Sequence, residues 1–100
     1  MITAPSRDVG ADLAKRIVAA KLAACVNLVN GVESFYWWEG AVQSDQEILL
    51  IVKTDQERVA ELRDRVLEWH PYDTPEFIVF EITDGSASYL SWIRESVGVS

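Results

Sequence analysis

The sequence predicts an α+β sandwich of ferredoxin-like βαββαβ order, followed by a C-terminal helix. Two observations lead there. Apolar residues recur at helical spacing in two segments, while β-branched and aromatic residues dominate the segments between them, with turn residues at the junctions. The 100 residues make one domain, 1–100, and leave no room for a second. Since this fold carries many unrelated activities, function must be argued from particular residues.

The first strand and helix are predicted at the N-terminal end. Met1 to Thr3 form the stub of a strand, which Ala4-Pro5 ends. Ser6 or Asp8 can cap a helix that continues to about Leu22. Acidic residues come early in this helix and basic residues late, the order that the helix dipole favours.

Two long strands are predicted next, joined as a hairpin. Cys25–Trp38 loses the helical period and is rich in Val, Phe, Tyr and Trp. Asn30-Gly31 predicts a bulge within it, and Glu39-Gly40 predicts the turn. The return strand begins near Val42, and its apolar half, Ile48–Val52, is expected to be buried on both faces.

The second half of the chain repeats the helix and strand order. Thr54 and Glu57 fit a capping box at the start of a helix that His70-Pro71 ends. Glu76–Thr83 alternates as a fourth strand does. Asp84-Gly85-Ser86 then predicts a turn into the last helix.

The hairpin is long for the chain that carries it. Each arm has about 14 residues against a usual five or six. At ~3.3 Å per residue an arm spans on the order of 45 Å, whereas a compact domain of this length has a radius of gyration of about 13 Å. The tip, which carries Phe35, Tyr36, Trp37 and Trp38, should therefore project. We expect an oligomer in which hairpins pair across subunits; alternatively, the aromatic side chains fold back onto their own core.

Composition excludes several classes of partner. The net charge of −7 argues against nucleic acid and against anionic membranes. The longest aliphatic run, Ile48–Val52, falls far short of the ~20 residues of a membrane helix, and no signal peptide is visible. A single cysteine, Cys25, excludes an internal disulfide and a four-cysteine zinc site. These features predict a cytoplasmic protein.

Six short motifs follow one another along the chain. They are Thr3-Ala4-Pro5-Ser6, Lys21-Leu22-Ala23-Ala24-Cys25-Val26-Asn27, Tyr36-Trp37-Trp38-Glu39-Gly40, Leu50-Ile51-Val52-Lys53-Thr54, His70-Pro71-Tyr72-Asp73-Thr74-Pro75-Glu76 and Tyr89-Leu90-Ser91-Trp92. By these motifs, which span nearly the whole chain, the sequence closely resembles the divalent-cation-tolerance protein CutA family. The resemblance implies a tight homotrimer with strands paired across subunits, a likeness to PII signal proteins, and a cytoplasmic bacterial or organellar location. It also implies a link to tolerance of copper and other divalent metals, with no enzymatic reaction firmly attached.

The chain departs from the family pattern at its start. Family members usually carry several more residues before Thr-Ala-Pro, whereas only Met1 and Ile2 stand there in this sequence. We therefore expect either a shortened first strand or a trimmed start.

The resemblance points to one metal-ligand position. The family's proposed copper ligands are a cysteine just before Thr-Ala-Pro and two adjacent histidines before Pro-Tyr. Ile2 and Trp69 occupy two of these positions, so only His70 matches. One imidazole is too few for Cu²⁺ or another divalent cation, so Asp73, Glu76 or another subunit would have to contribute. Alternatively, His70 bonds backbone carbonyls at the helix end or acts as a hydrogen-bond donor in a pocket.

A further set of residues predicts a pocket at a subunit interface. Its members are Cys25, Tyr36, Trp38, Lys53, Tyr72, Glu76 and Trp92. Lys53 ends an apolar strand, so its charge needs a partner if it is buried, and Glu76 is the candidate. The pocket would take a small ligand. The alternative is a structural ion pair with interface aromatics, and Cys25 as a small buried side chain.

No motif of nucleophilic or phosphate chemistry is present, since the chain lacks G-x-S-x-G, a P-loop and G-x-G-x-x-G. We therefore expect a non-enzymatic homotrimer of the CutA type in divalent metal (copper) tolerance or response, with a metal or small-molecule site between subunits. The alternatives are a PII-like sensor of a metabolite or nucleotide and a structural interaction module.

Overall fold

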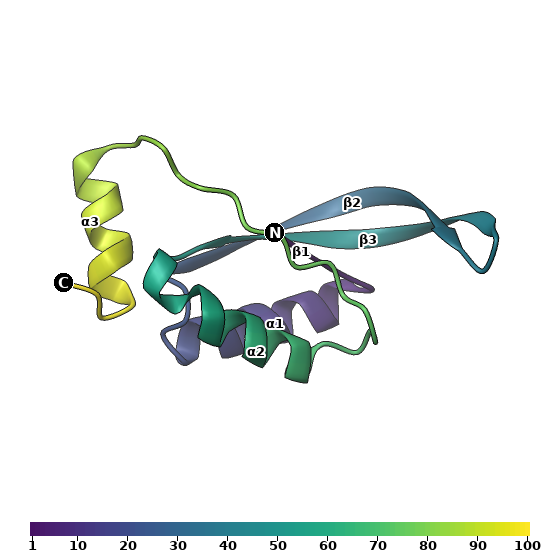
Figure 1. The fold of residues 1–100 in the computed structure, drawn as a ribbon, viewed down its shortest axis with the longest axis horizontal. Helices are drawn as coiled ribbons and strands as arrows, with labels where there is room; N and C mark the ends of the chain where they lie inside the picture. Colours follow the sequence, from purple (N-terminus) through teal and green to yellow (C-terminus); the bar gives the residue numbers. More distant parts are fainter.

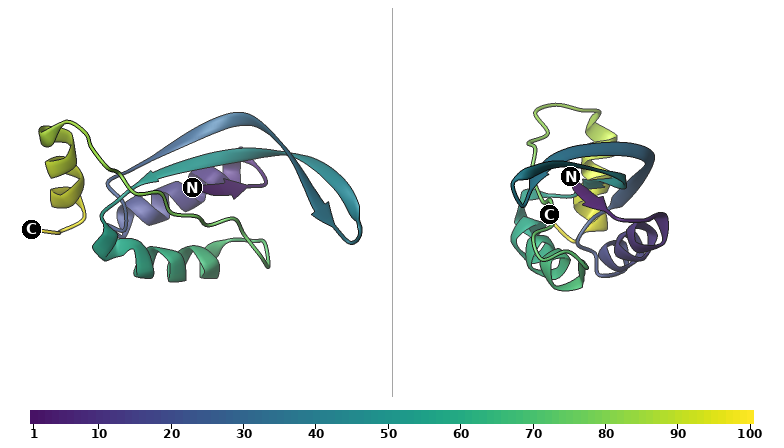
Figure 2. Two further views of the ribbon diagram at one scale, coloured as in Figure 1. Left: turned by 45° about the horizontal axis from the view of Figure 1, so that its top comes forward. Right: turned by 90° about the vertical axis from the view of Figure 1, so that its right-hand side faces the viewer.

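The computed structural model describes residues 1–100 and contains a three-stranded antiparallel sheet in the order β1-β3-β2. Helices α1 and α2 cover one face of this sheet, and α3 lies beyond the end of the sheet opposite the hairpin tip (Figures 1 and 2). The elements are β1 (Ile2–Ala4), α1 (Arg7–Ala19), β2 (Cys25–Trp38), β3 (Ala41–Lys53), a 3₁₀ turn (Gln56–Arg58), α2 (Val59–Trp69) and α3 (Ala87–Ser96). The predicted α+β class is confirmed. None of the helices combines the length and the apolar character that crossing a membrane requires.

Helix α1 begins at the predicted cap and ends earlier than predicted. The Ser6 hydroxyl accepts a hydrogen bond from the Val9 amide at 3.2 Å. The helix stops at Ala19, rather than near Leu22, because Lys21 takes a left-handed conformation with φ of 58°. Such a residue cannot continue a right-handed helix.

The hairpin has the predicted bulge and turn. The pairing of β2 with β3 shifts between Val29 and Val32, where Gly31 has φ of +75°. At the tip, Glu39 and Gly40 both have positive φ, the backbone that suits a two-residue hairpin turn. The tip projects beyond the body as predicted, and the molecule measures 46 × 26 × 21 Å (Figure 1).

The predicted burial of Ile48–Val52 on both faces is wrong. Leu50 is fully buried, whereas Ile51 is 38% exposed. The reason is that helices cover only one face of the sheet, so alternate side chains of β3 point away from them. The core lies between the sheet and the two helices, and its members are Ile2, Ala4, Leu13, Ile17, Leu22, Ala23, Leu50, Leu62 and Val66.

The predicted capping box is also wrong. The carboxylate of Asp55, not the hydroxyl of Thr54, accepts from the Glu57 amide at 3.0 Å. Thr54 instead donates its hydroxyl to the Leu22 carbonyl at 2.7 Å, which ties the end of β3 to the segment after α1. A polar side chain beside a turn can bond either a nearby backbone group or a distant one, and the Thr54 hydroxyl bonds the distant Leu22 carbonyl.

The fourth strand, predicted over Glu76–Thr83, does not form in the single chain. Its pairing is limited to a bridge between Ile2 and Phe77 and to two hydrogen bonds that Met1 and Ile78 exchange, at 2.7 and 3.1 Å. Residues 79–84 make no backbone–backbone hydrogen bond. The cause is the shortness of β1, which leaves no strand beside these residues, so the sheet has three strands rather than the four of a complete βαββαβ order.

Candidate functional site

The residues predicted to form one interface pocket fall into separate groups on the structure. Lys53 and Cys25 lie together at one end of the sheet, while Tyr72 bonds Glu47 where the hairpin begins to project and Tyr36 bonds Asp45 nearer the tip. Trp38 and Trp92 belong to neither group. A single chain therefore does not bring the predicted set together.

His70 is buried, with 6% of its surface exposed, and both ring nitrogens are engaged. Its Nε2 lies 2.7 Å from the Thr3 carbonyl, and its Nδ1 accepts from the Tyr72 amide at 3.1 Å. Because a carbonyl only accepts and an amide only donates, Nε2 must carry the proton and the ring is neutral. His70 also caps α2, since its amide donates to the Val66 carbonyl at 2.8 Å.

A metal ion does not fit His70 within one chain. Either nitrogen could bind a metal only by giving up its present partner. Nowhere do three His, Cys, Asp or Glu side chains gather in a way that could hold a metal ion. Within the chain His70 acts as the hydrogen-bonding residue that the sequence offered as the alternative, and a metal role would need ligands from another subunit.

Tyr72 extends this arrangement to the hairpin. Its ring lies 4.8 Å from that of His70, and its hydroxyl donates to Glu47 Oε2 at 3.1 Å. Partial burial, together with this bond, raises the pKa of Tyr72 to about 12. A continuous path of contacts thus runs from Thr3 on β1 through His70 and Tyr72 to Glu47 on β3.

A second tyrosine and carboxylate pair lies further along the hairpin. The Tyr36 hydroxyl donates to Asp45, and this bond is the main cause that raises the pKa of Tyr36. Sequence reasoning missed Asp45 and Glu47 as partners. The available signal was their spacing, because residues two apart on a strand share a face. Both carboxylates belong to the part of β3 that precedes the residues paired with β1.

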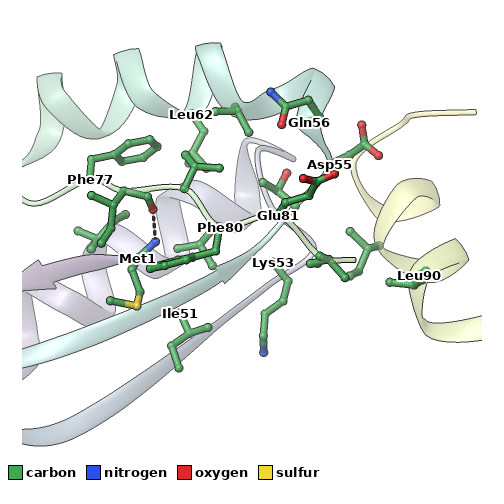
Figure 3. A pocket seen from close by; sticks show the side chains of 18 of the residues that line it. Met1, Ile51, Lys53, Asp55, Gln56, Leu62, Phe77, Phe80, Glu81 and Leu90 are labelled. Carbon is green, nitrogen blue, oxygen red and sulfur yellow. Dashed lines mark hydrogen bonds between the residues drawn. The ribbon is translucent and has the colours of Figure 1, made fainter. Parts of the chain in front are cut away.

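Lys53 and Cys25 are cross-strand partners at the end of the hairpin nearest α3. The Lys53 ammonium donates to Asn27 Oδ1 and lies 3.9 Å from Cys25 Sγ. Figure 3 shows the Lys53 side chain pointing away from α2. The predicted pair of Lys53 with Glu76 does not form in one chain, because neither residue takes part in any of the three salt bridges.

The two tryptophans lie on exposed elements. Trp38 is at the hairpin tip and 58% exposed, and Trp92 is on α3 and 43% exposed, with its ring 5.5 Å from that of Tyr89. At the tip, Phe35 and Trp37 are 68% and 74% exposed. The alternative, in which the tip aromatics fold back onto their own core, is therefore wrong.

A groove of about 630 Å³, which the sequence did not predict, lies between the sheet and the segment that leads to α3 (Figure 3). The end of β3, Leu62 of α2, residues 77–82 and α3 line it. Helix α3 is anchored beside it by two contacts: Arg58 Nε donates to the Val97 carbonyl at 2.8 Å, and Arg94 pairs with Asp55 at 3.6 Å.

Comparison with known proteins identifies the family of this chain. The family model of the CutA1 divalent ion tolerance protein matches residues 1–96. The chain belongs to the CutA1 family. This confirms the resemblance inferred from the six motifs.

Individual CutA proteins are similar over most of this chain. The divalent-cation tolerance protein CutA of Thermus thermophilus is 46% identical over 98% of the chain and 95% of its own length. The chloroplastic protein CutA of Arabidopsis thaliana is 53% identical, and the chain spans about half of its length, 52%.

Solved CutA structures share the fold. The protein of Thermus thermophilus superposes with a TM-score of 0.93 at 46% identity, covering 95% of this chain and 92% of its own. The periplasmic divalent cation tolerance protein CutA of Archaeoglobus fulgidus gives 0.93 at 45% identity, covering 96% and 93%. Because these names place relatives in different compartments, they do not fix a location for this chain.

Proposed function

We propose that this CutA1-family protein acts as a homotrimer in divalent metal-ion tolerance, with a ligand site between subunits and copper as the foremost cation. The observation that carries the proposal is the amount of strand edge and aromatic surface that a single chain leaves uncovered. Strand β2 pairs only with β3, so its outer edge presents free backbone groups along the hairpin.

Assembly would pair the free backbone groups at both edges of the sheet. One side ends at β2 and the other at the unpaired segment 79–84. Two different edges that join head to tail generate a ring when the rotation closes, and three copies is the closure that the resemblance implies. The exposed tip residues, Phe35 and Trp37, would be covered in the same step.

The ligand site would be completed by the neighbouring subunit. Lys53 and Cys25 lie at the open end of the hairpin and have no acidic partner in their own chain. A neighbour could bring Glu76 to Lys53, and Trp38 or Trp92 to the tyrosine pairs. A copper ion would take Cys25 at that end, or would take His70 at its own place if the ring gave up one of its present hydrogen bonds, in each case with groups of the second chain, since imidazole and thiolate suit copper.

The remaining parts of the proposal concern activity and location. The protein is non-enzymatic and cytoplasmic, and it binds neither nucleic acid nor membranes. The net charge of −7 and the lack of a catalytic motif support this.

Native mass spectrometry during a Cu²⁺ titration tests the proposal. The expected result is a trimer that takes up one copper per subunit. Two variants, Cys25→Ser and His70→Gln, should each reduce uptake, and Asp64→Asn, which changes an exposed carboxylate of α2 outside the predicted pocket, serves as the control. A monomer at all concentrations would refute the assembly.

A trimer that binds no copper in proportion to its subunits would refute the metal site. Stabilisation of that trimer by a nucleotide or metabolite would then favour the PII-like sensor, whereas no ligand effect at all would favour the structural module.

A further inference from the structure

Strand β2 is interrupted once along its length, at the bulge. The register with β3 shifts between Val29 and Val32, so that Asn30 and Gly31 together lie opposite the single residue Ile48. The extra residue of a bulge is left unpaired, the ladder is disrupted there, and the strand bends. The pairing of β3 with β1 also ends at Ile48, so only two strands continue from this point to the tip (Figure 1). The bulge therefore lies at the base of the projecting part of the hairpin.

The two residues of the bulge are open to solvent. Asn30 and Gly31 are both exposed. Gly31 has φ of +75°, and no atom lies within 4 Å of the place that a Cβ would occupy there. The side-chain amide of Asn30 has no hydrogen-bond partner, whereas that of Asn27, on the same strand, accepts from the Lys53 ammonium. Contacts with neighbouring side chains therefore do not hold the Asn30 amide in place.

An asparagine carries an amide carbon, Cγ, that can close a ring with the backbone nitrogen of the following residue. Two features oppose this closure: the side chain of the following residue crowds the nitrogen, and strand pairing fixes the backbone. Glycine has no side chain and adopts many backbone conformations, and at a bulge the pairing is interrupted. Asn30-Gly31 lacks both obstacles, while Asn27, which precedes Leu28 and pairs with Ile51, has both.

We propose that Asn30 is a self-modification site, at which the side-chain amide is lost as ammonia through a cyclic imide formed with the nitrogen of Gly31. The reaction needs no enzyme and no oxidant, and water is its only co-reactant. Because the product forms at the base of the projecting hairpin, the modification changes the direction of the tip. The proposal depends neither on the trimer nor on a metal.

The reaction has two steps, and neither is an oxidation or a reduction. In the first, the Gly31 nitrogen gives its proton to hydroxide and attacks Asn30 Cγ. A new C–N bond forms, the bond from Cγ to the side-chain nitrogen breaks, and that nitrogen leaves as ammonia with a proton from water. In the second, water adds to one carbonyl of the imide and opens the ring. Opening at Cγ leaves aspartate, and opening at the backbone carbonyl leaves isoaspartate, whose main chain runs through Cγ.

Both products alter the hairpin. Each adds a negative charge to a segment, residues 22–52, in which every charged side chain is acidic: Glu33, Glu39, Asp45 and Glu47. Isoaspartate also inserts a further atom into the main chain of the bulge. Because a bulge sets the local bend and twist of its strand, this insertion should turn the segment from Val32 to Trp38 relative to the rest of the sheet.

Incubation of the full-length protein at mildly alkaline pH, with samples taken over time, tests the proposal. Peptide mass spectrometry with fragmentation locates the conversion of amide to carboxylate, and Asn27 serves as the control within the chain. Asn30 should react at least about tenfold faster than Asn27, because reaction at Asn27 requires local opening of a paired strand. A synthetic peptide of residues 26–34 gives the rate without a sheet, and Asn30 in the protein should react within about tenfold of that rate.

Two variants test the two reacting groups separately. Asn30→Gln keeps a neutral amide but moves it one carbon further from the Gly31 nitrogen, so this side chain should stay intact. Gly31→Asn places a side chain beside the attacking nitrogen while it tolerates the left-handed backbone, and it should slow the reaction at Asn30 by at least about tenfold. Circular dichroism before incubation checks that both variants are folded.

The tryptophans report the effect on the hairpin. Trp37 and Trp38 lie at its tip, whereas Trp69 lies on α2 and Trp92 on α3. In NMR spectra of the incubated protein, the indole N–H signals of the two tip residues should each gain a second, shifted signal, and those of the other two should stay single. Incubated Asn30→Gln should show single signals throughout.

Three outcomes would overturn the proposal. They are equal rates at the two asparagines, an Asn30 that stays intact while the synthetic peptide reacts to completion, and second tip signals in incubated Asn30→Gln. Native mass spectrometry of the same samples reports the oligomeric state separately. Conversion of Asn30 in whatever assembly is present supports the proposal, and failure of the trimer to form refutes only the proposed function.

Discussion

Removing the His70 side chain should destabilise the fold even in the absence of metal. The ring is buried, with 6% of the residue exposed, and joins β1 to the loop after α2 through Thr3 and Tyr72. In His70→Ala both partners, a carbonyl and an amide, lose their bond. Each group left unpaired costs about 1–3 kcal/mol, so the loss of unfolding free energy for the two should be about 2–6 kcal/mol.

The size of the loss should depend on which bond the replacement restores. His70→Gln can place an amide N–H near the position of Nε2 and so keep the bond to Thr3, while it loses the acceptor for Tyr72. We expect it to lose about half as much as His70→Ala. Exposed Trp92→Phe should change stability by less than about 0.5 kcal/mol.

Urea unfolding of metal-free protein, followed by circular dichroism at fixed protein concentration, measures these differences. A His70→Ala variant as stable as the parent would refute the structural role of the ring. That result would also mean that the His70 imidazole of the parent protein is not needed for these hydrogen bonds and is available to a metal. The same measurement shows whether loss of copper uptake in a His70 variant reflects a lost ligand or a lost fold.

Three further predictions follow from the hairpin. Burial, and after it the bond to Glu47, raises the folded-state pKa of Tyr72 from 10 to about 12, so its neutral hydroxyl should stabilise the protein below pH 10, and this contribution, up to about 1 kcal/mol on a partly exposed group, should disappear between pH 10 and 12; an ultraviolet titration in which Tyr72→Phe removes no late-titrating tyrosine would contradict this. Gly40→Val forces a β-branched residue to φ of +77° and should cost about 1–2 kcal/mol in urea unfolding, whereas a neutral effect would show that the turn relaxes. Replacing exposed Phe35 and Trp37 by serine should weaken self-association in sedimentation and leave the secondary structure intact, and an unchanged oligomer would exclude the tip from the interface.

The sequence correctly predicted the features that depend only on residues adjacent in the chain. The cap at Ser6, the bulge at Asn30-Gly31 and the turn at Glu39-Gly40 all depend on the conformations that neighbouring residues allow, so they appear in the chain as written. The six motifs likewise identified the CutA1 family, because family membership is a matter of residue type and order along the chain.

Sequence patterns failed where the outcome depended on distant partners. Glu76–Thr83 has the composition of a strand, yet a strand needs a neighbour, and the short β1 supplies one only as far as Ile78. Ile51 has the apolar character of a core residue, yet its exposure depends on which face the helices cover.

The candidate site shows the same division. The sequence by itself determined the family, the hairpin and which residues are able to bind a ligand, because these follow from residue type and order. Only the tertiary structure decided that both nitrogens of His70 are engaged, that Lys53 meets Asn27 and Cys25 rather than Glu76, and that a groove lies between the end of β3 and residues 77–82. These facts depend on which groups come within hydrogen-bond distance after the helices pack on the sheet, and spacing along a chain does not encode that distance.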